Sequence, residues 1–322
     1  MFPGNTAIIG HARIQQVLTR MIEHDTLPHA FLFVGPHAIG KTTMAQALIR
    51  HLLGSQTQVQ NHPDYQEVQR LVDEKTEKRK TSISVKQIRE LTARLGLTSL
   101  SGGWKIVFFE QAQFLSQGAA NALLKTLEEP KGKTLFIFCT THLEQVPATI
   151  ASRCQVMRFN QVSRQEIGES LVRLGFSPPD ATLAASMALG RPGKALRFLK
   201  ESLYRSQWET RVGQALAFFS ASLPERLAQV MTLIPKTDTK KTESLLELLD
   251  QWELVCRDVL FKQLNLKEIQ VFSQDERINS LVTHLPLASL MSVFERLNQV
   301  RRAIPRHVNP HLALEHIGLF SK

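Results

Sequence analysis

Residues 33–43 of the chain read FVGPHAIGKTT and contain the pattern GxxxxGKT. Glycines let a loop turn tightly, so that its backbone N–H groups converge on phosphate at the start of the next helix. The lysine of such a loop reaches the terminal phosphates and the threonine ligates magnesium. The spacing therefore predicts a site for ATP or ADP with Mg²⁺. Its expected residues are Gly35, Pro36, His37, Ala38, Ile39, Gly40, Lys41, Thr42 and Thr43.

A second position that could take part in catalysis lies at the end of the apolar run KIVFFE, residues 105–110. Nucleotide hydrolases with this loop hold magnesium with an acid at the end of a neighbouring strand. Glu110 is the candidate, together with Thr42. The next residue is Gln111, at the position where many such enzymes have a glutamate that activates water. A glutamine cannot accept a proton from water, and losing a general base costs about 10²–10⁴ in rate. Glu110 followed by Gln111 therefore predicts that the chain binds nucleotide but hydrolyses it weakly or not at all.

The elements that must position these residues alternate in the first half of the chain. AFLFVG, KIVFFE and TLFIFCT are short, nearly continuous apolar runs, as buried parallel strands require. Helical patterns follow the phosphate loop at residues 41–53 and occupy SQGAANALLKTLEEP, which ends at Pro130. Residues 55–81 are polar and predict a loop with a solvated charged segment. The pattern predicts an α/β domain, a parallel sheet with helices on both faces.

Helical patterns dominate after Phe159. Residues 161–203 contain short helical stretches broken by FSPPD and GRPG, and long amphipathic patterns run from there to the end. We therefore expect an α/β nucleotide-binding domain at residues 1–160, a small helical lid at 161–203 and an all-α domain at 204–322.

Composition bounds the class of protein. The 322 residues are 43% hydrophobic and 21% charged, an ordinary globular composition, and no apolar run approaches the length of a membrane helix. Because the start also lacks a secretory signal, we expect a cytoplasmic protein. The formal charge of +10 favours polyanionic partners such as nucleic acid. Cys139, Cys154 and Cys256 show no CxxC spacing, which excludes a four-thiolate zinc module.

Several further motifs together resemble the clamp-loader family of AAA+ ATPases, and within it the delta-prime branch of bacterial DNA polymerase III. They are GAANALLKTLEEP (118–130), PATIASRC (147–154), HPD (62–64), ISVKQIREL (83–91), GRPGKAL (190–196) and NPHLALE (309–315). The motifs are dense over the first two hundred residues and sparse in the helical tail. The resemblance implies a hetero-pentameric ring with gamma/tau and delta subunits that loads a sliding clamp on primer-template DNA. It also implies that the helical tail is the collar that joins the ring.

The resemblance also implies roles for single residues. Arg153, in Ser-Arg-Cys, would act in trans as an arginine finger on a neighbouring subunit's nucleotide, since its forked donors suit a γ-phosphate. The alternative for Arg153 is an ordinary surface ion pair. Thr141 matches a sensor position that touches phosphate or water, although a threonine at a strand end is often structural.

Three departures from the family pattern qualify this picture. Gln111 replaces the catalytic acid, which suits a stationary subunit whose polymerase label would belong to the holoenzyme. Gly193 stands where motor subunits keep a sensor arginine, with Arg191 and Lys194 nearby. Residues 54–61 lack the zinc-binding cysteines of many relatives, so zinc is not expected. A gamma/tau-like motor ATPase of the same ring and a DNA-binding scaffold with an empty loop remain alternatives.

Overall fold

The computed structural model describes residues 8–54, 59–72, 79–96, 98–99, 102–234, 241–266, 270–272, 275–304 and 308–320. The chain divides into two compact units. The first comprises Met1–Ala181 with Gly190–Lys194, and the second comprises Thr182–Leu189 with Ala195–Lys322. This two-way division does not test the three expected domains, which remain a prediction. Parts of the expected charged segment and of the cysteine-free stretch lie outside the described residues.

The first unit is built on a five-stranded parallel sheet. Its strands are β1 (Ala30–Val34), β2 (Tyr65–Val68), β3 (Lys105–Phe109), β4 (Thr134–Thr140) and β5 (Gln155–Arg158). They are ordered β2-β3-β4-β1-β5. Because β1, β3 and β4 are neighbours and all run in one direction, the residues that follow them meet at one edge of the sheet. This is the edge at which open parallel sheets bind ligands.

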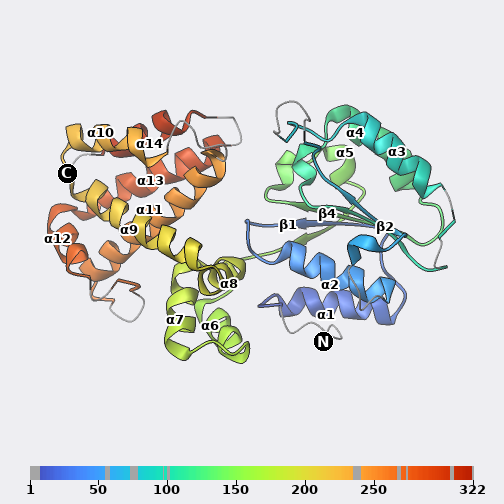
Figure 1. Ribbon diagram of the computed structural model, residues 1–322, viewed down its shortest axis with the longest axis horizontal. Coiled ribbons are helices and arrows are strands. Elements are labelled where there is room, and N and C mark those ends of the chain that lie inside the picture. Colours follow the sequence, from blue (N-terminus) through green and yellow to red (C-terminus); the bar gives the residue numbers. More distant parts are fainter. Residues whose placement is uncertain are drawn as a thin grey trace. The chain divides into compact units, whose positions relative to one another are not determined.

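Side chains of the central strands alternate between two hydrophobic cores. On one face, Phe31 and Phe33 pack with helices α1 (Ala12–Glu23) and α2 (Lys41–Leu53). On the other face, Leu32 packs among helices α3, α4 and α5. Helix α3 spans Val85–Leu95, α4 spans Gln117–Glu128 and α5 spans Ala148–Ala151. Figure 1 shows the two helical layers on opposite sides of the sheet. Burial on both faces explains the continuous apolar runs in the sequence.

Two strands were not expected from the sequence. Strand β2 lies inside the stretch predicted to be a loop, and β5 directly precedes Phe159. Both are short edge strands, each paired with one neighbour. In β5 only Met157 is buried, so its sequence lacks the apolar run that marked the central strands. The prediction of an unbroken loop at residues 55–81 is therefore wrong at β2.

The rest of the chain is helical in the described residues. Between the sheet and the tail lie α6 (Arg164–Arg173), α7 (Pro178–Met187) and α8 (Pro192–Lys200). The tail consists of α9 (Ser202–Ser220), α10 (Leu223–Leu233), α11 (Lys241–Gln263), α12 (Glu276–His284), α13 (Leu287–Ala303) and α14 (Pro310–Gly318). The predicted α/β domain followed by helices is confirmed.

An aromatic cluster forms the core of the helical tail. Trp252 of α11 is fully buried and stacks on Phe218 of α9, with ring centroids 4.2 Å apart. Phe219 packs edge-on against the same indole and also contacts Phe320. The cluster joins α9, α11 and the segment after α14. In the described part of the chain, no helix is long and apolar enough to cross a membrane.

Candidate nucleotide site

The phosphate loop connects β1 to α2, as the sequence predicted. The backbone of the loop makes a close approach and adopts left-handed conformations that favour small residues. A Cβ atom on Gly35 would lie 2.5 Å from the carbonyl oxygen of Phe159, so the loop leaves the sheet where a larger residue would collide. Gly40 has φ of 112° and Ala38 has φ of 60°, both in the left-handed region. This is the conformation that turns loop N–H groups toward a common point in front of the helix.

Lys41 is the buried cation of the loop. Its ammonium group donates to the carbonyl oxygens of Gly35 and Pro36, at 2.6 and 2.7 Å. Burial lowers the pKa of Lys41 to about 8, opposed by the Cys139 thiol and the Glu110 carboxyl. Because an ammonium in a desolvated position gains strongly from an opposite charge, this lysine is suited to bind phosphate.

Further basic side chains surround the loop. The pKa of His37 is lowered by burial and by the charges of Lys41, Arg191, His142 and Lys194. The sequence GRPG at residues 190–193 contacts the loop directly, since the Gly193 N–H donates to the Ala38 carbonyl at 2.8 Å. A Cβ on Gly193 would meet the same oxygen at 2.8 Å. The absence of a side chain at Gly193 thus lets the backbone of this segment pack on the phosphate loop.

Two predicted site residues lie at the carboxyl edge of the sheet. Thr141 follows β4, and the Gly35 N–H donates to the carbonyl of Thr140 at 3.2 Å. The Thr141 hydroxyl lies 3.4 Å from the Gln145 side-chain oxygen and 3.0 Å from His142 Nδ1. Glu110 follows β3 and lies close enough to Lys41 to influence its pKa. The sheet therefore brings Gly35, Thr141 and Glu110 to one edge.

Gln111 contacts a residue that sequence reasoning did not identify. Arg70 Nη2 donates to Gln111 Oε1 at 3.4 Å, and its guanidinium lies 3.6 Å from the centre of the Phe114 ring. A carboxylate at position 111 would face this cation, which would lower its basicity. Position 111 is thus unfavourable for a general base for two reasons. The glutamine amide cannot accept a proton, and the Arg70 guanidinium would lower the basicity of a carboxylate there. Arg70 carries no local motif, so only the folded chain reveals the contact.

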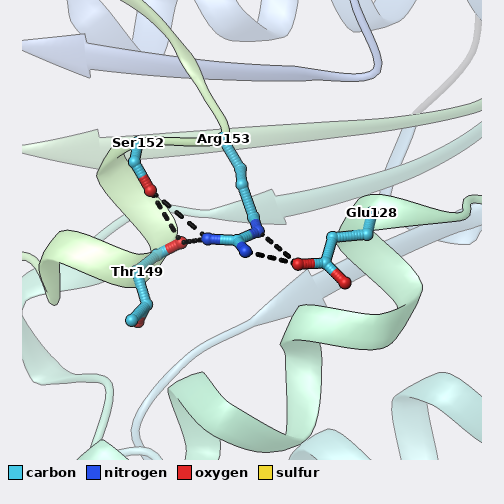
Figure 2. Close-up of polar contacts among 4 residues, drawn as sticks. All are labelled: Glu128, Thr149, Ser152 and Arg153. Atoms are coloured by element: carbon cyan, nitrogen blue, oxygen red, sulfur yellow. Dashed lines mark hydrogen bonds and ion pairs between the residues drawn. The ribbon is translucent and has the colours of Figure 1, made fainter.

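Arg153 lies two residues after the end of α5 and forms hydrogen bonds within its own chain (Figure 2). Its Nε donates to Glu128 Oε1 at 2.7 Å, and its Nη2 forms an ion pair with the same oxygen. Its Nη1 donates to the Thr149 carbonyl at 3.0 Å and to the Ser152 hydroxyl at 3.3 Å. The surface ion pair that was the alternative for Arg153 is therefore present, and it leaves the side chain 35% exposed.

Arg153 and the phosphate loop lie on opposite faces of the sheet. Helix α5 contributes Ile150 to the core shared with α3 and α4, whereas α2 belongs to the other core. All the bonds of Arg153 described above go to residues of α4 and of the α5 region. The structure therefore does not bring Arg153 together with Lys41 or Glu110, although it joins the other predicted residues.

His11 is another contact that the sequence did not signal. Its Nε2 lies 2.9 Å from the carbonyl oxygen of Ile39 in the loop, and its ring packs on Phe159 at 4.8 Å. His11 precedes α1 and has φ of 59°, so it reaches the loop from an unusual backbone conformation. A lone histidine near the start of a chain gives no pattern from which this role could be predicted.

The residues present fit a magnesium nucleotide. The loop backbone and Lys41 would hold phosphate, and Thr42 with Glu110 offers the oxygen ligands that Mg²⁺ prefers. The three cysteines are free, and burial raises the pKa of Cys139 and of Cys154 to about 12. Among the described residues, no three His, Cys, Asp or Glu side chains gather as a metal-binding group.

A parallel sheet of this strand order, a phosphate loop after β1 and a helical segment that reaches the loop define an AAA+ P-loop protein. Comparison with solved structures agrees. A gamma subunit-related protein of DNA polymerase III from Thermotoga maritima matches 94% of this chain and 96% of its own, with TM-score 0.51 and 19% identity. That likeness concerns the fold.

Sequence comparison finds similarity to subunits of DNA polymerase III. The family described as "DNA polymerase III, delta subunit" matches residues 10–163. DNA polymerase III subunit delta' of Escherichia coli K12 is 33% identical over 208 residues, 59% of this chain and 59% of that protein. DNA polymerase III subunit gamma of Buchnera aphidicola (subsp. Acyrthosiphon pisum) is 26% identical over 271 residues, 80% of this chain and 74% of its own length. These matches support the resemblance to the DNA polymerase III clamp-loader family that the motifs predicted.

Proposed function

We propose that the chain is a delta-prime-like clamp-loader subunit that binds nucleotide, hydrolyses it weakly and acts on the nucleotide of a neighbouring subunit. The observation that carries the proposal is the separation of its two cationic groups. Lys41 is buried in the chain's own phosphate loop, while Arg153 lies on the opposite face of the sheet. A guanidinium so placed is available to a second molecule.

The chain's own site would bind ATP or ADP with Mg²⁺. Backbone N–H groups of residues 37–42 and the Lys41 ammonium would hold the phosphates, with Thr42 and Glu110 on the metal and Thr141 beside them. The bound metal would neutralise phosphate charge. Because Gln111 is an amide that accepts from Arg70, no side chain at that position takes a proton from water. Binding would therefore exceed turnover.

In the assembled ring, Arg153 would stabilise charge on the neighbour's γ-phosphate. Fingers supplied in trans contribute about 10³–10⁵ in rate. The partners would be gamma/tau and delta subunits, with the sliding clamp and primer-template DNA as the objects of loading. The second unit, residues 182–189 and 195–322, would include the collar that joins the ring. Such a protein would work in the cytoplasm.

The experiment uses the purified chain. We expect saturable binding of ATP with Mg²⁺ by calorimetry, a raised melting temperature on binding, and little phosphate release. Lys41→Ala should weaken the binding about 10- to 100-fold. Rapid hydrolysis by the chain alone, unchanged in Lys41→Ala, would contradict the proposal.

A gamma-like motor subunit is the second candidate. It is favoured by the intact phosphate loop and by the match to a gamma subunit over 80% of this chain. The two candidates differ in turnover within the ring. If Lys41→Ala in this subunit stops ring ATPase to the same extent as the equivalent change in every other nucleotide-binding subunit, the motor function is correct. A smaller, partial loss supports the delta-prime-like function.

A further inference from the structure

The ion pair between Glu128 and Arg153 carries a further inference, which rests on the proposed trans function of Arg153. We propose that Glu128 is a positioning residue that fixes the Arg153 guanidinium for contact with the neighbouring subunit's phosphate. Figure 2 shows the guanidinium between Glu128 on one side and Thr149 with Ser152 on the other. An arginine without these contacts would move among many rotamers.

The hydrogen bonds define the guanidinium's orientation. Glu128 accepts from Nε and from Nη2, while the Thr149 carbonyl and the Ser152 hydroxyl accept from Nη1 at 3.0 and 3.3 Å. A guanidinium has five N–H groups, and these bonds leave the second hydrogen of Nη2 unused. The second Nη2 hydrogen can donate to a phosphate oxygen, and Nη1 completes a bidentate fork by exchanging its longer bond to Ser152, at 3.3 Å, for the phosphate. Holding the Nε edge on Glu128 therefore fixes the direction of the Nη1/Nη2 fork, and only the Ser152 contact must be given up when phosphate binds.

Both partners are attached to the same rigid core. Glu128 is the last residue of α4, next to the fully buried Leu127. Arg153 follows α5, in which Ile150 is also fully buried, and both residues belong to one hydrophobic cluster. The carboxylate and the Arg153 backbone thus have fixed relative positions, which is a requirement for one side chain to orient another.

The exposure of the pair argues against a role in stability. The Arg153 side chain is 35% exposed and that of Glu128 is 49% exposed. Ion pairs this accessible to water contribute little to folding. Fixing one long side chain before association instead improves a contact by about threefold to tenfold. Positioning is therefore the larger expected effect of Glu128.

The test combines the free chain with the reconstituted ring. In the free chain, the Arg153 Nε–H resonance in NMR spectra should be resolved, remain in Glu128→Gln, which keeps an acceptor oxygen, and be lost in Glu128→Ala. In the ring, Glu128→Ala should lower the kcat of DNA-stimulated ATPase about threefold to tenfold, with the KM for ATP within about twofold. Glu128→Gln should restore most of the rate.

Controls separate this proposal from the proposed function. Glu129→Ala removes an adjacent carboxylate and should change neither the resonance nor the rate, and the melting temperature of Glu128→Ala should fall by less than about 2 °C. A Glu128→Ala/Arg153→Ala double variant should be no slower than Arg153→Ala. If Arg153→Ala slows the ring but Glu128→Ala does not, the positioning role is wrong and the trans role stands. If Arg153→Ala has no effect, both are wrong.

Discussion

On one face of the sheet, the phosphate loop and α2 enclose a lysine that is almost wholly buried, held by backbone carbonyls. On the other face, Arg153 is a third exposed and is held by a carboxylate from another helix. The first arrangement suits a ligand that the chain binds by itself, because burial strengthens attraction to phosphate. The second suits a ligand that arrives with another subunit. The contrast assigns nucleotide binding to Lys41 and action on a neighbouring subunit's nucleotide to Arg153.

Removing the buried cation should have the largest effect. Lys41→Ala should weaken ATP binding to the free chain about 10- to 100-fold, because a charged hydrogen bond contributes about 1.5–3 kcal/mol. Calorimetric titration measures it. Arg153→Ala is the matched variant on the other face and should leave this affinity unchanged. Equal losses in the two variants would remove the distinction between the faces.

The pH dependence of binding should be the next largest effect. The Lys41 pKa is lowered to about 8 in the free chain, so its charge is lost as pH rises above that value. Bound phosphate favours the ammonium and raises its pKa. ATP affinity should therefore fall by about tenfold for each pH unit above 8, until the pKa of the bound state is reached.

Fluorescence titration of a labelled ATP analogue between pH 7 and 9.5 checks this dependence. Lys41→Arg keeps its charge throughout and should show a flat profile over the same range. A wild-type profile that is equally flat would contradict a role for the lysine charge.

Crowding the contact between Gly193 and the phosphate loop should have a smaller effect. A Cβ on Gly193 would lie 2.8 Å from the Ala38 carbonyl, so Gly193→Ala must displace the loop. Overpacking costs about 1 kcal/mol at the lower end of its range, so ATP affinity should fall about fivefold. Gly213→Ala is a control, since its Cβ would meet only Arg277 Nη1 at an ordinary 3.7 Å. Unchanged affinity in Gly193→Ala would show that the contact is irrelevant to the loop.

Restoring the missing acid should have the smallest effect. In Gln111→Glu the new carboxylate would face Arg70, which lowers its basicity, so the free chain's hydrolysis should rise less than about threefold. Steady-state phosphate release measures the change. Adding Arg70→Ala should increase the rise. A large increase from Gln111→Glu alone would favour the motor alternative.

The sequence predicted the parts of this fold and site that depend on local pattern. The central strands were visible because both faces are buried, and the phosphate loop because its backbone needs glycines at fixed spacing. Edge strands β2 and β5 were missed because they carry too few apolar residues. Arg70, His11 and Glu128 were missed because each contact joins residues that are 25 or more positions apart in the sequence. Pairings of this kind exist only after folding.

The most direct measurement is a structure of the assembled ring with a non-hydrolysable ATP analogue. The account predicts that the Arg153 guanidinium lies within hydrogen-bond distance of a phosphate oxygen bound by the neighbouring subunit, with Glu128 still bonded to its Nε. An Arg153 that bonds only to its own chain, with no neighbouring phosphate within reach, would contradict it.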